Sequence, residues 1–202
     1  MSDFLKQKRI ILATGSPIRQ KLFASLGLEF ECIPSHCDES SIKAAFDSSQ
    51  LIDLGYALAK AKALEVSKAH PEAWIIAADQ LCITEYGILD KPMVHESAIE
   101  HLKLLRGKTH QQAACMCIAK AGEILWTHHD VALLTMKYLD DAVINAYLHE
   151  DKPYHSCGAY QYESMGKWLF ESVEGSEDTI LGLTLNPLIK ALTDLNICTI
   201  EP

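Results

Sequence analysis

Hydrophobic and polar positions follow two distinct patterns along this chain. Short apolar runs rich in β-branched residues end at polar turn residues, which is typical of buried strands. Longer stretches carry apolar residues every three or four positions, which predicts amphipathic helices. The predicted strands span 9–13, 28–34 and 73–83, with two long strands around the turn Ala121–Gly122 within 111–139. The predicted helices are one that begins at Pro17, then 51–69, 95–105 and one capped by Asp140 within 140–150.

The order of these elements predicts the fold class. The segment 35–50, "SHCDESSIKAAFDSSQ", is a polar loop or a short helix, and 84–92, "TEYGILDKP", is a hairpin turn. Strands and helices are mixed without strict alternation, and the sequence contains no repeat and no low-complexity linker. We therefore expect an α/β protein with a mixed, elongated β-sheet.

The stretch "LATGSPIRQKL" at 12–22 places a small polar loop between a strand and a helix. Ser16 is a good helix N-cap, and Pro17 suits the first helical position. Free backbone N–H groups at such a junction point outward at the positive end of the helix dipole, and Arg19 adds a fixed charge one turn further on. The loop is therefore either a phosphate-binding site or simply a capped helix with a surface arginine. It is not a Walker loop, because no G-x-x-x-x-G-K-[ST] occurs.

Composition narrows the class of protein. The chain has 202 residues, of which 49% are hydrophobic, and this is enough for one substantial domain, or a domain of two lobes, with a real core. The start "MSDFLKQKR" is charged where a secretory segment would be apolar, and no apolar run reaches the length of a membrane span. We expect a soluble, cytoplasmic protein that does not bind membranes. Its seven cysteines fit reduced thiols better than a disulfide framework.

The net charge of −9 argues against a broad surface for nucleic acid. An anionic small substrate would need a locally basic cleft, together with a divalent cation to offset the acidic groups.

Several charged residues interrupt apolar segments. Asp79 follows "WIIAA" at the end of a predicted buried strand, the place where open α/β sheets usually bind ligands. A carboxylate there is costly unless it is paired, binds a metal or acts as a base. Asp38 and Glu39 lie in the polar segment, Lys91 follows the hairpin turn, and Glu163 lies within "CGAYQYESMGKWLF". Each alone is more often a solvated or paired charge, but together with the opening loop they form a more specific pattern.

At this point the sequence resembles the Maf family (septum-formation-associated) of nucleotide pyrophosphatases. The similarity runs in order over nearly the whole of 1–202, which is identified as a single Maf-like domain. The matching segments are "LATGSPIRQKLFASLGLEFE", similar to S-P-x-R-x-x-L-L-x-x-L-G, then "CDES", "LAKAKA", "AADQLCI", "LDKP", "LRGKTHQ", "CGAYQYESMG" and "VEGSEDTILGLTLNPLIKAL". The resemblance implies a fold like that of inosine triphosphate pyrophosphatases, in which helices flank an elongated mixed sheet and two lobes surround a central cleft.

The resemblance also implies roles for individual residues. The residues that would hold the phosphates of a nucleoside triphosphate are Ser16, Arg19, Lys62 and Lys91. Glu39 and Asp79 would bind Mg²⁺ or Mn²⁺, and Asp79 would also be the general base that orients a water molecule. The implied reaction is hydrolysis of the α–β phosphoanhydride to a nucleoside monophosphate and pyrophosphate, and the resemblance allows a homodimer. These residue types suit the chemistry, because cations neutralise the leaving pyrophosphate and a carboxylate can deprotonate water.

Three positions depart from the commonest family pattern and concern the choice of base. Gln80 stands where many members carry Thr and Glu163 where many carry Gln, and both resemble the branch that acts on 7-methyl-GTP. Glu163 could accept hydrogen bonds from N1–H and the amino group of a guanine, and a positively charged N7-methylated ring strengthens that attraction. Ile18 stands where many members carry Arg and where this branch favours a large aromatic residue that would stack on the ring. Ser164 and Thr184 are smaller departures.

Other polar clusters have structural interpretations. His128, His129 and Asp130 are adjacent on a predicted strand, so their side chains alternate between faces and a shared metal ion is not expected. Cys115 and Cys117 share a face and are expected in the core.

Two further features stay open. The cluster of Tyr160, Tyr162 and Trp168 suits core packing and base stacking equally. His110 matches a family position, but the sequence does not define its role.

Two further functions remain open beside a 7-methyl-GTP pyrophosphatase. One is a nucleotide-binding regulator of cell division and septum formation, in which binding rather than turnover matters. A pure binder would have less need of Asp79. The other is a dTTP/UTP pyrophosphatase, which Gln80 and Glu163 disfavour.

Overall fold

The apolar runs of the sequence form the strands of a mixed β-sheet, and amphipathic helices pack on it. The computed structural model describes residues 4–47 and 50–201. The strands are β1 (Leu5–Gln7), β2 (Ile10–Leu12), β3 (Glu31–Cys32), β4 (Trp74–Thr84), β5 (Gly87–Leu89), β6 (Thr109–Lys120), β7 (Glu123–Met136), β8 (Phe170–Glu174) and β9 (Cys198–Ile200). The α-helices are α1 (Pro17–Ala24), α2 (Glu39–Ala44), α3 (Leu51–Ala69), α4 (His95–Leu105), α5 (Asp141–Asp151), α6 (Glu177–Ile180) and α7 (Leu185–Asp194), and the 3₁₀ helices are η1 (Cys157–Ala159) and η2 (Met165–Leu169).

The hydrogen-bonded order of the main sheet is β3-β2-β4-β6-β7-β8, and β5 pairs with β4. Parallel and antiparallel pairs both occur, because β2 pairs with β3 and β4 in parallel whereas β5 and β8 pair antiparallel with their neighbours. The expected mixed α/β sheet with flanking helices is therefore confirmed. A separate pair, β1 with β9, joins the two ends of the described chain in antiparallel register.

The chain divides into two compact units. The first comprises Met1–Asp79, Ala114–Asp130 and Gly182–Pro202, and the second comprises Gln80–Ala113 and Val131–Leu181. Strands β4, β6 and β7 contribute residues to both units.

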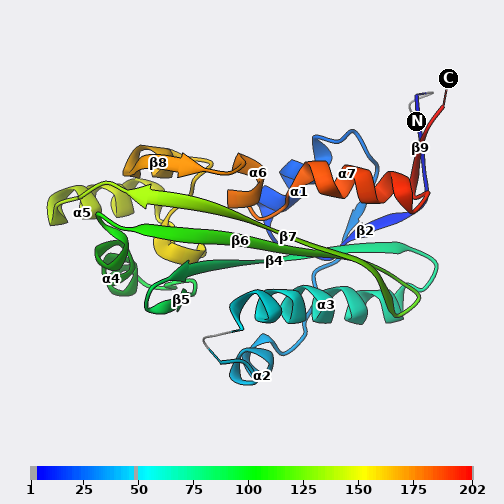
Figure 1. Ribbon diagram of the computed structural model, residues 1–202, viewed down its shortest axis with the longest axis horizontal. Helices are drawn as coiled ribbons and strands as arrows, with labels where there is room; N and C mark the ends of the chain where they lie inside the picture. Colours follow the sequence, from blue (N-terminus) through cyan, green and yellow to red (C-terminus); the bar gives the residue numbers. More distant parts are fainter. Residues whose placement is uncertain (1–3, 48–49, 202) are drawn as a thin grey trace. The chain divides into compact units, whose positions relative to one another are not determined.

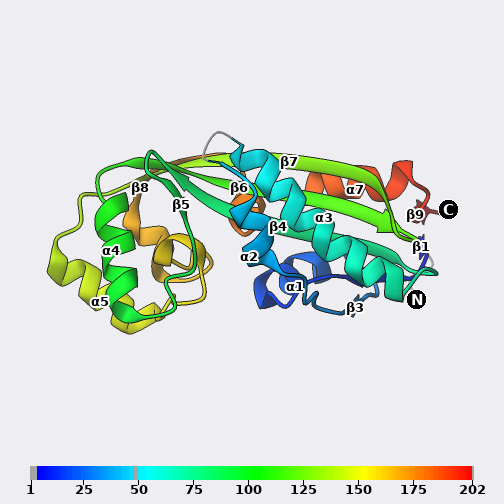
Figure 2. The same cartoon turned by 90° about the horizontal axis from the view of Figure 1, so that it is seen from below.

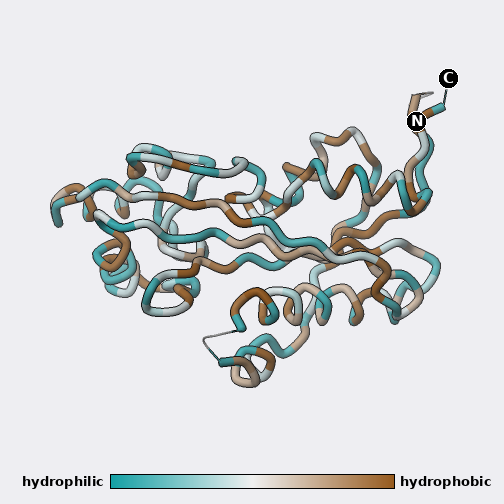
Figure 3. The backbone as a smooth tube through the Cα atoms, viewed as in Figure 1, coloured by the Kyte–Doolittle hydropathy of each residue, from teal (hydrophilic) through white to brown (hydrophobic). Residues whose placement is uncertain are grey.

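The core of the first unit follows the two-residue period of its strands. On β4, Ile76 and Ala78 pack with α1 and α7, whereas Ile75 and Ala77 pack with α3. Figure 1 shows α7 and α3 on opposite sides of the sheet, and Figures 1 and 2 both show α2 beside α3. The strand is buried on both faces, so it reads as a nearly continuous apolar run, which Figure 3 shows in its colouring. Asp79 continues the odd-numbered series and therefore faces α3.

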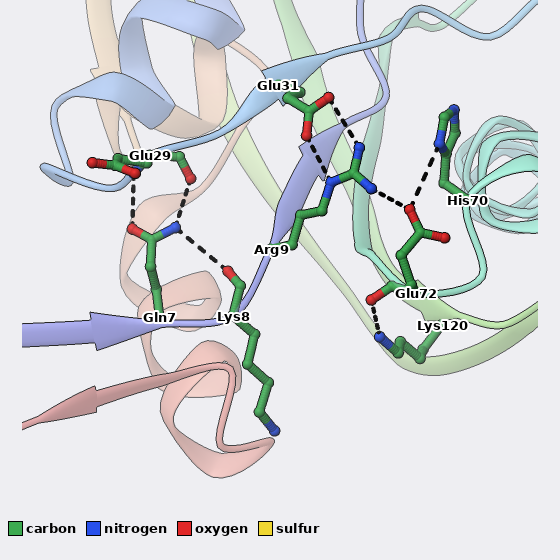
Figure 4. A network of polar contacts seen from close by, with 8 residues as sticks. All are labelled: Gln7, Lys8, Arg9, Glu29, Glu31, His70, Glu72 and Lys120. Atoms are coloured by element: carbon green, nitrogen blue, oxygen red, sulfur yellow. Dashed lines mark hydrogen bonds and ion pairs between the residues drawn. The ribbon is translucent and has the colours of Figure 1, made fainter. Parts of the chain in front are cut away.

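Polar contacts of Arg9 fix the start of β2 (Figure 4). Arg9 Nε donates to Glu31 on β3 at 2.7 Å, and its guanidinium also pairs with Glu72, just before β4. These side chains are exposed, so each pair contributes little to the free energy of unfolding. The contacts instead join the segments on either side of β2 to its start.

The second unit has its own core, formed between α4, α5 and the distal part of β7. Leu102, Ile144 and Leu134 are fully buried there. The Ala121–Gly122 turn, which belongs to the first unit, has positive φ at both residues (48° and 81°), as a tight two-residue hairpin requires.

The sequence-based expectations hold for the strongly patterned elements. The expected helices 51–69 and 95–105 match α3 and α4, the long hairpin is present, and Asp140 caps α5 by accepting a hydrogen bond from the Val143 backbone N–H. The 28–34 strand is much shorter than expected, because only Glu31 and Cys32 pair with β2. The segment 35–50, expected to be a polar loop or a short helix, contains the short helix α2, and its residues 48–49 lie outside the described residues. Within the described chain, no helix is long and apolar enough to cross a membrane.

Candidate active site

The β2–α1 loop forms a strand-to-helix junction as the sequence predicts. The Ser16 side chain caps α1 by accepting from the Arg19 backbone N–H at 3.5 Å, and Pro17 opens the helix. Thr14 Oγ1 accepts from the Ser16 backbone N–H at 3.1 Å, so the loop is folded onto its own polar side chains. The dipole of α1 favours an anion at this end.

Arg19 is held in place by Gly182, a residue of the matching segment 173–192 to which the sequence alone assigns no role. Its Nε donates to the Gly182 carbonyl at 2.9 Å, across 163 positions of the chain. The two terminal guanidinium nitrogens have no hydrogen-bond partner among the described residues. An arginine whose Nε is hydrogen-bonded and whose two terminal nitrogens are without partners is suited to binding phosphate oxygens.

Lys62, Asp79 and Glu39 come together around one ammonium group. Lys62 Nζ lies 2.6 Å from Asp79 Oδ1 and 3.0 Å from Glu39 Oε1. The Lys62 and Asp79 side chains are largely buried, with 14% and 11% of their surface exposed, whereas that of Glu39 is 45% exposed. A buried carboxylate needs such compensation, since an unpaired charge in this position would be strongly destabilising.

Local structure explains how these three side chains converge. Asp79 lies on the α3-facing side of β4, and Lys62 extends from α3. Glu39 is the first residue of α2, whose N-cap Asp38 accepts hydrogen bonds from the Ser41 hydroxyl and backbone N–H. Those bonds lower the pKa of the Asp38 carboxyl. Asp38 thus caps α2, whereas its neighbour Glu39 pairs with Lys62.

The β2–α1 loop and Asp79 both come after the residues that pair β2 with β4 in parallel. Leu12 on β2 pairs with Ile76 on β4, and the next residue, Ala13, donates its backbone N–H to the Ile76 carbonyl. Ser16 therefore follows the carboxyl end of β2, a common ligand-binding position in α/β sheets. Asp79 lies within β4, three residues beyond the pairing of Ile76 with β2 and not at the end of its strand as expected, because β4 continues to Thr84.

The donor set suits a divalent cation of the Mg²⁺ type. Two carboxylates are present, and no group of three or more His, Cys, Asp or Glu side chains that could hold a metal occurs in 4–47 or 50–201. Mg²⁺ usually takes one or two protein carboxylates and completes its shell with water and substrate phosphates. Glu39 and Asp79 fit that pattern, and they do not fit a closed all-protein site.

The remaining predicted site residues lie in the second unit. Lys91 is exposed and has no polar partner among the described residues, and Glu163 is exposed in the turn before η2. The Gln80 amide nitrogen donates to the carbonyls of Thr179 and Ile180, so its side chain anchors α6. Ile18, in the first unit, is partly exposed in the first turn of α1. Their assigned roles in phosphate binding and base choice stay predictions.

A buried polar network in the second unit was not predicted. The Tyr160 hydroxyl accepts from Gln112 Nε2 at 2.7 Å and lies 2.8 Å from His110 Nε2. Burial lowers the pKa of His110 to about 4, so the ring is neutral and Nε2 can accept the tyrosine proton. His110 Nδ1 and Gln112 Oε1 have no partner in the described part of the chain. The network defines the surroundings of His110, whose role the sequence left open.

Two alternatives raised by the sequence receive structural explanations. His128 stacks on Trp126, whereas His129 Nδ1 lies 2.8 Å from the Tyr56 hydroxyl on α3, so these neighbours face opposite sides as expected. Cys115 and Cys117 are buried, and burial raises the pKa of both thiols to about 12. All seven cysteines lie among the described residues, and no disulfide joins any two of them.

The aromatic cluster divides. Tyr160 and Tyr162 pack against Phe170 at centroid distances of 4.9 and 5.9 Å, whereas the Trp168 side chain is 72% exposed. The two tyrosines are therefore part of the core or its margin.

The fold and the site together define an α/β protein whose first unit contains a carboxylate–lysine centre and a capped strand-to-helix junction. The family model described as Maf-like protein matches residues 9–195, and the chain belongs to this family. A curated relative named nucleoside triphosphate pyrophosphatase, from Legionella pneumophila (strain Paris), is 55% identical over 98% of each chain.

Two other similar proteins are more distant. A relative named 7-methyl-GTP pyrophosphatase, from Mesorhizobium japonicum, is 38% identical over 93% of this chain and 96% of its own. The solved structure of a nucleoside-triphosphatase / dITP/XTP pyrophosphatase from Mycobacterium abscessus is 12% identical, covers 93% of this chain and 94% of its own, and has a TM-score of 0.45.

Proposed function

We propose that this protein is a metal-dependent nucleoside triphosphate pyrophosphatase that prefers 7-methyl-GTP. The observation that carries the proposal is the convergence of Asp79 and Glu39 on Lys62, in a largely buried position of the first unit. Membership of the Maf-like family and the names of its relatives support the reaction class. The 38% identical relative named for 7-methyl-GTP supports the preferred substrate.

The reaction assigns separate tasks to the residues of the site. Asp79 accepts a proton from a water molecule, whose oxygen attacks the α-phosphorus. The bond from that phosphorus to the bridging oxygen breaks, and pyrophosphate leaves with the bridging oxygen and its electron pair. The products are a nucleoside monophosphate and pyrophosphate.

Positive charge stabilises the leaving group. Arg19, Lys62 and Lys91 neutralise the phosphate oxygens, and the α1 N-terminus with Ser16 adds backbone donors. Mg²⁺ or Mn²⁺, held by Asp79 and Glu39, would supply Lewis-acid stabilisation of the charge that develops on the phosphates. Glu163 would accept hydrogen bonds from the guanine edge, and its exposed position in the second unit leaves it accessible to a ligand.

The test is a pyrophosphate-release screen over 7-methyl-GTP, GTP, ATP, CTP, UTP and dTTP, with Mg²⁺, Mn²⁺ or EDTA. We expect pyrophosphate and the monophosphate as products, the highest kcat/KM on 7-methyl-GTP, and no release in EDTA. Release only from dTTP and UTP would replace the substrate assignment. Tight nucleotide binding without any pyrophosphate would instead support a nucleotide-binding regulator and overturn the enzyme assignment.

A further inference from the structure

The Lys62 ammonium occupies the position that the proposed function assigns to a metal ion. It contacts Asp79 Oδ1 at 2.6 Å and Glu39 Oε1 at 3.0 Å, and these two carboxylates are the proposed metal ligands. The Lys62 and Asp79 side chains are largely shielded from water, so the contact is stronger than a surface ion pair.

A divalent cation and this ammonium cannot share the two carboxylates in the arrangement observed. A cation bound to Asp79 and Glu39 would lie close to Lys62 Nζ, and like charges at that distance repel strongly in a poorly solvated site. The observed pairing therefore differs from the arrangement that catalysis requires.

We propose that Lys62 is an exchangeable internal cation, which holds the two carboxylates together without metal and moves onto a substrate phosphate when a divalent cation binds. The inference rests on the proposed function for the identity of the second cation. The Lys62 side chain is long enough for its ammonium to move while α3 stays fixed, since its charge lies at the end of a flexible four-carbon stem. Metal binding would thereby release a phosphate-binding group, so that metal and nucleotide bind cooperatively.

The chain provides a matched control for this exchange. Lys60 lies on the same helix and carries the same charge, but its ammonium lies over the Tyr56 ring, 5.5 Å from the centroid. Replacing Lys60 changes the net charge of the first unit as much as replacing Lys62 does, without removing the ion pairs to Asp79 and Glu39.

Titration calorimetry with Mn²⁺ and no nucleotide tests the proposal on the whole protein. We expect Lys62→Met to raise the affinity for Mn²⁺ by about tenfold or more, because the competing cation is gone, while Lys60→Met changes it by less than about threefold. Unchanged or weaker binding in Lys62→Met would overturn the exchange. An equal gain in both variants would also overturn it, since a general field effect would then suffice.

A second measurement uses the wild-type protein and therefore does not depend on whether the variant folds. Acetic anhydride should acetylate Lys62 faster after Mn²⁺ is added, as read by mass spectrometry, because an ammonium released from a buried pair is more accessible. The rate at Lys60 should stay constant. A Lys62 rate that falls or stays unchanged at saturating Mn²⁺ would reject the proposal.

Pyrophosphate release separates the two hypotheses. Exchange without pyrophosphatase activity would reject only the proposed function, and activity without exchange would reject only the role of Lys62 as an exchangeable cation.

Discussion

Lys62 Nζ lies 2.6 Å from Asp79 Oδ1, although the two residues stand 17 positions apart on a helix and a strand. This contact gives a buried carboxylate the positive partner that it needs. It also places the proposed general base of the enzyme beside a group that can bind phosphate, so the effects of replacing either residue can be predicted.

Asp79→Asn should lower kcat for pyrophosphate release by about a hundredfold or more, because the amide cannot accept the proton of water and carries no charge for a metal. The shape of the side chain is kept, so circular dichroism should show a folded protein. Asp53→Asn is the control, since Asp53 is an exposed carboxylate in the first turn of α3. Near wild-type turnover in folded Asp79→Asn would remove the proposed mechanism.

Arg19→Ala should lower kcat/KM by roughly tenfold or more on every nucleotide, because a charge-assisted hydrogen bond to phosphate is lost and phosphates carry no base identity. The comparison is Lys21→Ala, which removes an exposed charge from the last turn of α1. Initial rates over the nucleotide panel provide the measurement. A change in base preference with unchanged rates on some nucleotides would mean that Arg19 does not bind phosphate.

Lys91→Ala should have the same uniform effect, because its exposed ammonium has no polar partner among the described residues and is available to an anion. The matched control is Lys152→Ala, at another lysine of the second unit. If Lys91→Ala left kcat/KM unchanged for all nucleotides, the phosphate position implied by the family resemblance would be wrong.

We expect the buried His110 to make the free energy of unfolding depend on pH in the acidic range. Its pKa is about 4 in the folded protein, because the ring is buried, and about 6.5 in an unfolded chain. Between these values the unfolded chain binds a proton that the folded protein does not, so the free energy of unfolding decreases as the pH falls from about 6.5 to 4, by about 3 kcal/mol in total. Above pH 6.5 the contribution of His110 is constant.

Urea unfolding at several pH values measures this dependence. In His110→Gln the decrease between pH 6.5 and 4 should be smaller by about the amount assigned to His110. His155→Gln, at an exposed position, serves for comparison. The same pH dependence in His110→Gln and wild type would show that other groups cause the acid sensitivity.

How far the sequence predicts this structure depends on how local each signal is. The bounds of α3 follow from helical spacing within one segment, and the hairpin follows from Ala121–Gly122 between two long runs. Helix α7 was not predicted, although it is strongly amphipathic, and its N-cap Thr184 makes no side-chain capping bond that would mark its start. The shortness of β3 depends on which residues pair with β2, and this pairing is set by the tertiary structure.

The same distinction applies to the site. The Ser16 cap was predictable, because it rests on neighbouring residues. The expected position of Asp79 at the end of its strand was wrong, because β4 continues to Thr84 and pairs there with β5. The anchoring of Arg19 by Gly182 joins residues 163 positions apart, and no periodicity or composition carries that information. The Tyr160 network likewise requires His110 and Gln112, on one face of β6, to meet a turn nearly fifty positions later. Long-range contacts of this kind depend on packing, which local patterns do not encode.

Glu163 should determine the preference for the base. Glu163→Gln replaces a charged acceptor by a neutral amide, while the phosphate-binding residues stay intact, so kcat/KM on 7-methyl-GTP should fall much more than on dTTP or UTP. A charge-assisted hydrogen bond of roughly 1.5–3 kcal/mol corresponds to a shift in preference of about ten- to a hundredfold. Glu171→Gln, an exposed carboxylate on β8, controls for the change in net charge.

Ile18→Trp tests the same base preference through stacking. Ile18 is partly exposed in the first turn of α1, and an indole there could stack on the positively charged methylated ring, so activity on 7-methyl-GTP should rise relative to GTP, which lacks that charge. Initial rates on the two nucleotides measure the ratio. An unchanged ratio in Ile18→Trp would exclude this position from base recognition.

Equal losses on all nucleotides in Glu163→Gln would mean that Glu163 acts on the structure or on the phosphates. The 7-methyl-GTP assignment would then fall, while a pyrophosphatase that releases pyrophosphate from other nucleotides would remain.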